Sequence, residues 1–140
     1  AVGGEVKTRP DLEETGTFEV RLTRAGEDDR LLKSLPSRFL AQQGHHDVVL
    51  SMPSEWIRLA DSERCHWQAF KHPEKPFYGL QFHPELRRED FMDRMRAYAD
   101  SYASTPEVFE EINKQVQQTH NEEVILSFLR MVEESQKQGA

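Results

Sequence analysis

The spacing of apolar residues changes near residue 88 of this 140-residue chain. Before that point, apolar and polar residues alternate in short runs, as in residues 17–22 (Thr-Phe-Glu-Val-Arg-Leu), which is typical of strands with one buried face. After it, Phe91, Met95 and Tyr98 recur at spacings of three and four, which is typical of a helix with one buried face. Residues 1–88 are therefore predicted to be rich in strands and residues 89–140 to be helical, in an α/β or α+β fold.

Turn-forming residues divide the first part into short elements. Further strands are expected at residues 38–42, 48–50, 56–60, 65–70 and 77–82. We expect a turn at residues 25–29 and a loop at residues 44–47 (Gly-His-His-Asp). A short helical turn through residues 31–35 should end at Pro36, because proline cannot continue a helix.

Three helices are expected in the second part. They cover residues 90–102, a segment that starts after Thr105, and a segment that starts near Asn121. Thr105 precedes Pro106 as a cap residue precedes a proline at the first helical position. The last helix carries one apolar stripe, made of Val124, Ile125, Phe128, Leu129 and Val132. We expect this stripe to pack on the sheet or on the preceding helix.

Length and composition limit the classes of protein that this chain can belong to. A chain of 140 residues has room for one domain with a modest core, so residues 1–140 are interpreted as a single domain. No apolar run is long enough to span a membrane. The formal net charge is -7 and basic residues are interspersed with acidic ones, so no basic stripe is available for nucleic acid. A single cysteine excludes an intrachain disulfide and favours a cytoplasmic protein.

The N-terminus begins as though inside a structural element. Ala1 and Val2 are followed by a glycine pair suited to ending a helix and by Glu5-Val6, which begins a strand pattern. No initiator Met is present. We therefore expect a processed or truncated chain whose N-terminal part is missing.

The most informative string is residues 78–86, Tyr-Gly-Leu-Gln-Phe-His-Pro-Glu-Leu. Residues two apart in an extended segment project to the same side, so His83 and Glu85 can meet. Pro84 fixes one backbone angle and favours an extended His83. A carboxylate beside an imidazole sets its tautomer, as a Cys or Ser nucleophile requires of its base. The plainer alternative is a surface ion pair without a catalytic role.

Residues 79–85, Gly-Leu-Gln-Phe-His-Pro-Glu, resemble the catalytic His-x-Glu segment of class I glutamine amidotransferases. The resemblance covers most of the chain. Residues 3–6 are similar to the stretch after that family's nucleophile helix, and residues 44–49 resemble its Ser/Gly-His-x-Asp loop. Residues 59–62 and 68–70 resemble the strands that follow that loop. The resemblance implies a class I glutamine amidotransferase-like (flavodoxin-like) α/β sheet flanked by helices.

The resemblance also implies roles for individual residues. His83 would be the general base and Glu85 its orienting partner, while His45, His46 and Asp47 would lie beside the substrate, glutamine or another γ-glutamyl small molecule. No cofactor is implied. The paired histidines could in principle belong to a metal site, but the other histidines have no metal-ligand spacing, and no metal is predicted.

One part of the family pattern is absent. The family's nucleophile lies in a Gly-x-Cys-x-Gly elbow, which should fall a few residues before Ala1 and does not occur in this sequence. Cys65 has no flanking glycine to form such an elbow and is interpreted as a small buried residue on a strand. The family's first strands are also absent, so we expect an exposed sheet edge unless another segment or a partner chain covers it.

The resemblance predicts that the intact protein hydrolyses glutamine to glutamate and ammonia through a Cys-His-Glu triad. Without the Cys, the chain should be inactive alone. Two alternatives stay open. The chain could be an inactive pseudo-enzyme or partner-binding fragment, or it could derive from a γ-glutamyl hydrolase or peptidase of the same fold.

Overall fold

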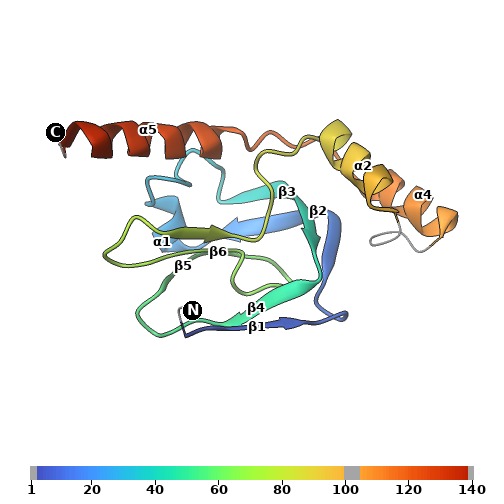
Figure 1. The fold of residues 1–140 in the computed structure, drawn as a ribbon, viewed down its shortest axis with the longest axis horizontal. Helices are drawn as coiled ribbons and strands as arrows, with labels where there is room; N and C mark the ends of the chain where they lie inside the picture. The colour runs from blue at the N-terminus through green and yellow to red at the C-terminus, as the bar shows by residue number, and fades with distance from the viewer. Residues whose placement is uncertain (1–2, 100–104, 139–140) are drawn as a thin grey trace.

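The computed structural model describes residues 3–99 and 105–138 (Figure 1). Its strands are β1 (Glu5–Thr8), β2 (Glu14–Leu22), β3 (Arg38–His45), β4 (Asp47–Ser51), β5 (Ile57–Asp61), β6 (Ala69–Lys71) and β7 (Tyr78–Leu80). Its helices are α1 (Arg24–Glu27), α2 (Arg88–Ala97), α4 (Pro106–Gln115) and α5 (Glu123–Gln138). The described strands all precede the three long helices, so a strand-built body carries helices that follow it in the chain.

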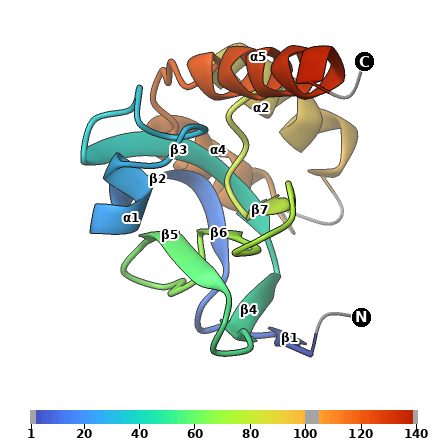
Figure 2. The same ribbon diagram turned by 90° about the vertical axis from the view of Figure 1, so that its left-hand side faces the viewer.

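The strands form a curled antiparallel sheet. β1 pairs with β4, and a second sheet has the order β3-β2-β5-β6-β7, with antiparallel pairing throughout the described strands. After β7 the chain returns to β3, where the amide of His83 donates a hydrogen bond of 2.9 Å to the carbonyl of Gln42. This bridge joins the two ends of the five-stranded sheet, which curls round as Figure 2 shows. It therefore covers part of the β3 edge.

The main core fills the inside of the curl. The inward residues of β2 and β3 include Val20, Phe39 and Ala41, which are at most 8% exposed, as their alternation with polar neighbours predicts. Phe39 packs edge-to-face on Phe82, with ring centroids 5.5 Å apart. A smaller cluster of Phe91, Met92, Met95 and Val116 joins α2 to the end of α4. The segment around His83 therefore lies between two packed clusters.

Local hydrogen bonds alter the elements expected at residues 25–29 and 65–70. Residues 24–27 form the short helix α1 where a turn was expected, because the Thr23 hydroxyl accepts a hydrogen bond of 3.1 Å from the Gly26 amide and caps the helix. The strand expected at residues 65–70 is limited to β6, because the Ser62 hydroxyl accepts the Cys65 amide at 2.9 Å and holds a turn before it.

Gly26 allows α1 to lie against β5. A Cβ atom built on Gly26 would lie 2.0 Å from the carbonyl oxygen of Leu59. That carbonyl also accepts a hydrogen bond of 2.8 Å from the amide of Thr23. The glycine is therefore required by close backbone approach.

The prediction for the apolar stripe of the last helix is wrong for most of its members. Val124 is 2% exposed, but Ile125, Phe128, Leu129 and Val132 are between 38% and 51% exposed. The helix expected at residues 90–102 ends at Ala97, and residues 100–102 of that prediction lie outside the described residues. No helix in the described ranges is both long and apolar enough to cross a bilayer.

Candidate functional site

His83 and Glu85 meet where the chain leaves β7 and reaches β3. His83 Nδ1 lies 2.7 Å from Glu85 Oε1, and the two side chains are 28% and 49% exposed. The backbone bond from His83 to Gln42 fixes the imidazole relative to β3. Since the carboxylate accepts the proton on Nδ1, the lone pair lies on Nε2, the nitrogen that can take a proton from a nucleophile.

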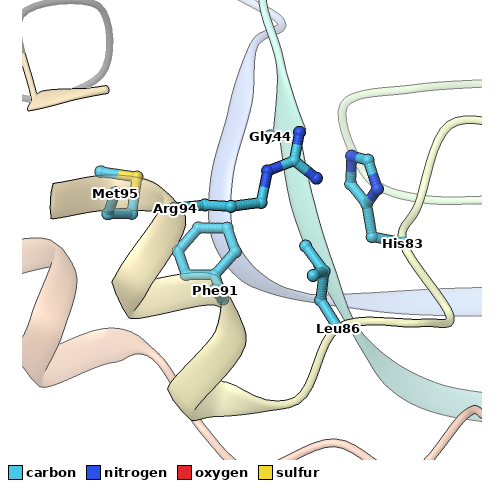
Figure 3. A pocket seen from close by; sticks show the side chains of 6 residues that line it. All are labelled: Gly44, His83, Leu86, Phe91, Arg94 and Met95. Carbon is cyan, nitrogen blue, oxygen red and sulfur yellow. The ribbon is translucent and has the colours of Figure 1, made fainter. Parts of the chain in front are cut away.

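A small pocket opens beside the imidazole (Figure 3). It is lined by Gly44, His83, Leu86, Phe91, Arg94 and Met95. A Cβ atom built on Gly44 would meet nothing within 4 Å, so this position of β3 leaves space at the pocket. The walls supplied by Leu86, Phe91 and Met95 are apolar, and such walls strengthen electrostatic interactions with the polar groups beside them.

Arg94 adds a permanent positive charge to the lining of the pocket. Arg94 Nη1 lies 4.0 Å from Glu85 Oε1, the same oxygen that contacts His83. In Figure 3 the guanidinium of Arg94 lies between Gly44 and His83. Sequence reasoning did not single out Arg94, because its place at the pocket depends on how α2 packs against the sheet.

The segment expected to be a loop at residues 44–47 is almost entirely strand. β3 continues to His45 and β4 begins at Asp47, so only His46 separates them. The backbone bends there because β3 pairs with β2 whereas β4 pairs with β1. The prediction of a loop is wrong, although the segment does reach the pocket through Gly44.

His45, His46 and Asp47 each contact a residue away from the pocket. His45 Nε2 lies 3.0 Å from Glu14 Oε2, and His46 Nδ1 lies 2.8 Å from Glu13 Oε2. Asp47 Oδ1 accepts a hydrogen bond of 2.6 Å from the hydroxyl of Thr8. None of the three is among the residues that line the pocket. Their role beside the substrate stays a prediction.

A buried polar cluster supports the end of β3. Glu14 is 1% exposed and accepts hydrogen bonds from the Ser62 hydroxyl, at 2.8 Å, and from the Gln68 amide. His45 contacts the same carboxylate. Because Glu14 is opposite His45 in the β2–β3 ladder, this cluster holds the strand next to Gly44. Glu14 is the first residue of β2, but the pairing register of β2 with β3 decides that its side chain faces the interior.

Cys65 is not placed to act as a nucleophile. Its side chain is fully buried, and Sγ lies 3.2 Å from the side-chain oxygen of Gln81. Burial raises the pKa of the Cys65 thiol from 9.0 to about 11. A thiol that is buried and neutral at physiological pH is unreactive, in agreement with its interpretation as a small buried residue, although it lies in a turn before β6.

Cys65 should react with iodoacetamide at pH 8 at least about 100-fold more slowly in the folded chain than in urea, because a pKa raised from 9.0 to about 11 reduces the thiolate fraction by that factor. Mass spectrometry of alkylated protein measures both rates. The pKa of Cys65 is higher in the folded chain than in the unfolded chain. The neutral thiol therefore makes its full contribution to the free energy of unfolding below pH 9, and this contribution is lost as pH rises toward 11. Comparable rates in both states would contradict this assignment.

Within residues 3–99 and 105–138, no group of three or more His, Cys, Asp and Glu side chains could hold a metal ion. The polar side chains at and beside the pocket are the His83 imidazole, its Glu85 carboxylate partner and the Arg94 guanidinium.

The sequence of this chain is similar to those of known proteins. The family model "Glutamine amidotransferase class-I" matches residues 1–99. A glutamine-hydrolyzing GMP synthase subunit of Methanocaldococcus jannaschii is 40% identical over 91 residues, which are 65% of this chain and 46% of that protein. The protein of the same name from Methanopyrus kandleri is 35% identical over 89 residues, 64% of this chain and 46% of its own length.

The fold of this chain is also similar to that of a solved structure. The crystal structure of a glutamine amidotransferase from Thermotoga maritima superposes with a TM-score of 0.68 and 27% identity, over 94% of this chain and 56% of that one. This chain therefore spans less than half the length of these two curated relatives and about half the length of the solved structure.

Proposed function

This chain belongs to the class I glutamine amidotransferase family, and we propose that it supplies the His-Glu part of a Cys-His-Glu triad that hydrolyses glutamine to glutamate and ammonia. The observation that carries the proposal is the 2.7 Å contact between His83 Nδ1 and Glu85, which leaves Nε2 available beside a pocket. Because Cys65 is buried, the nucleophile comes from a segment outside these 140 residues, and the chain alone is inactive.

The proposed reaction uses His83 as base and then as acid. Nε2 takes the proton of the thiol, and the sulfur attacks the carbon of the side-chain amide to form a tetrahedral intermediate. His83 then donates this proton to the amide nitrogen of the intermediate. The C–N bond breaks, ammonia departs, and the substrate remains bound to the sulfur as a thioester. Water, deprotonated by His83, cleaves the thioester to glutamate and regenerates the thiol. Glu85 holds the ring and stabilises the imidazolium in both stages.

The relatives support glutamine as the substrate. Two of them are named as glutamine-hydrolyzing GMP synthase subunits, and this name indicates that those proteins act with a further subunit. We propose that this protein likewise passes ammonia to a partner subunit. His45, His46 and Asp47 are proposed to lie close to the substrate, through the β3–β4 junction whose Gly44 lines the pocket.

The test is to join the chain behind a family segment that carries the Gly-x-Cys-x-Gly elbow and to measure glutamate and ammonia from glutamine. The chain alone and a fusion with elbow Cys→Ala are the controls. Glutamine turnover by the fusion, and by neither control, supports the proposal. A correctly folded fusion that releases no ammonia from glutamine would contradict it, and release only from other γ-glutamyl compounds would point to a hydrolase or peptidase.

Larger side chains at position 44 should block the site without unfolding the chain. A Cβ on Gly44 meets nothing within 4 Å, so G44A can be accommodated, and the longer side chains of G44L and G44F extend from the same position at the pocket. We expect kcat/KM of the fusion to fall as the side chain grows, by about 10²-fold for G44F, because a larger side chain displaces the substrate from His83 and spoils its alignment. Steady-state kinetics and urea unfolding measure the two effects. Equal kcat/KM for all three variants would place the substrate elsewhere.

A further inference from the structure

The side chain of Gln81 connects two sheets that no strand ladder joins. Gln81 lies two residues before His83, in the segment that leads from β7 to the bridge with β3. Within residues 3–99 and 105–138, β4 pairs with β1, and this pair is separate from the five-stranded sheet. Gln81 Nε2 donates a hydrogen bond of 3.1 Å to the carbonyl of Asp47, and Gln81 Oε1 accepts one of 2.9 Å from the amide of Val49.

These two hydrogen bonds have the pattern that a parallel strand neighbour would make. In a parallel ladder, a residue bonds to a carbonyl of the adjacent strand and to the amide two residues further along that strand. The carboxamide of Gln81 does the same with Asp47 and Val49, on either side of Val48, which is 1% exposed. Backbone groups beside a buried residue need partners. The side chain of Gln81 therefore takes the place of a strand on this side of β4.

Cys65 determines which way the carboxamide of Gln81 points. Its Sγ lies 3.2 Å from Gln81 Oε1, and a thiol can donate a hydrogen bond to that oxygen. Burial raises the pKa of the Cys65 thiol to about 11, so the sulfur keeps the proton for this contact. Oε1 then has two donors, the thiol and the amide of Val49, and Nε2 is left to face the carbonyl of Asp47.

The segment that carries Gln81 and His83 meets the β3–β4 junction at two points. Gln81 bonds to Asp47 at the start of β4, while His83 lies at the pocket with Gly44, near the end of β3. The amide of His83 also bonds to the carbonyl of Gln42 in β3. The position of the imidazole relative to the junction therefore depends on a backbone bond to β3 and on a side-chain contact with β4.

We propose that Gln81 is a positioning residue, whose carboxamide fixes β4 and the β3–β4 junction relative to the imidazole of His83. The inference rests on the proposed function, in which His45, His46 and Asp47 lie close to the substrate. It deepens that function because it names the side chain that aligns the junction with the base. A misplacement of about 1 Å costs roughly 10²-fold in rate, so hydrogen bonds away from the reacting atoms control the alignment.

The first experiment measures these hydrogen bonds in the 140-residue chain by hydrogen exchange followed with NMR. Gln81→Met has a similar length but cannot donate to Asp47. The amide of Val49 should exchange at least about tenfold faster in this variant, relative to amides of the β2–β3 ladder. Cys65→Ala, which keeps the carboxamide but removes its donor, should speed the same exchange by about threefold, and Cys65→Ser should not. Unchanged relative exchange of Val49 in Gln81→Met and Cys65→Ala overturns the inference.

Kinetics of the elbow-bearing fusion test the consequence for catalysis. Gln81→Met should lower kcat/KM for glutamine by about tenfold, because the junction and the base lose their alignment. The pH dependence of kcat/KM should keep its midpoint, because the contact between His83 and Glu85 is retained. Asn121→Ala is the control, since it also removes a buried carboxamide, one that donates to the backbone of β3 at Leu40. It should lower the free energy of unfolding and leave kcat/KM of the folded fusion unchanged.

The outcomes separate the role of Gln81 from the proposed function. If Asn121→Ala and Gln81→Met lower kcat/KM equally, the effect of Gln81 is general destabilisation and the inference is wrong. If the fusion hydrolyses glutamine and Gln81→Met leaves kcat/KM unchanged, the inference is also wrong, but the proposed function stands. If a folded fusion releases no ammonia from glutamine although the exchange of Val49 depends on Gln81, the proposed function fails, and Gln81 is a contact between two sheets without a role in catalysis.

Discussion

Replacement of His83 by alanine in the elbow-bearing fusion is expected to lower kcat for ammonia release by about 10²- to 10⁴-fold, the usual contribution of a positioned general acid-base group. In the proposed mechanism the imidazole acts in both stages, so its loss slows both thioester formation and thioester hydrolysis. KM for glutamine should change less, because the pocket walls are retained. A coupled glutamate assay measures both parameters.

The control for His83→Ala is His120→Ala, since His120 is an exposed histidine between α4 and α5 and does not line the pocket. It should leave kcat unchanged. Added imidazole should partly restore the rate of His83→Ala, because the free base can enter the space left by the side chain. Equal rates for His83→Ala and the unaltered fusion would remove His83 from the mechanism. Glu85→Gln should give an intermediate loss, because the amide can still contact the ring but cannot stabilise the imidazolium.

The largest expected effect on stability is that of Gly26→Ala, which should lower the free energy of unfolding by roughly 3 kcal/mol. The new methyl carbon would lie 2.0 Å from the Leu59 carbonyl oxygen, so α1 must move away from β5. That movement strains the hydrogen bonds of Thr23 to the carbonyls of Leu59 and Arg58, which are 2.8 Å long. Urea unfolding monitored by circular dichroism measures the loss.

Gly44→Ala is the matched control for Gly26→Ala, since it adds the same methyl group where nothing lies within 4 Å. It should change the free energy of unfolding by less than about 1 kcal/mol, with the sign set by the better strand propensity of alanine. If the two variants were equally stable, the close approach of α1 to β5 would not be rigid. A marginal domain that loses roughly 3 kcal/mol gives up a large share of its stability.

The sequence was sufficient for features that depend on neighbours in the chain. The alternation in β2 shows which residues face the core, and the start of α4 follows from Thr105, whose hydroxyl accepts the Val108 amide. The contact between His83 and Glu85 is also a feature that neighbours in the chain predict. Residues two apart around a proline have few conformations, so their meeting is a local property.

The sequence could not determine features that depend on how distant segments pack. The α5 stripe has the period of a packed helix, yet periodicity does not say how much of the stripe other elements cover. His45 likewise lies next to Gly44 in the chain but points to Glu14, because strand neighbours project to opposite faces and the β2–β3 register fixes which face is inside.

The sequence by itself determined the family, the strand-then-helix order and the His83–Glu85 pair, because each follows from short-range pattern. Only the tertiary structure decided that β7 returns to β3, which brings His83 beside Gly44, and that α2 sets Arg94 at the same pocket. These positions come from strand register and helix packing, where contacts between residues far apart in the chain must be satisfied together.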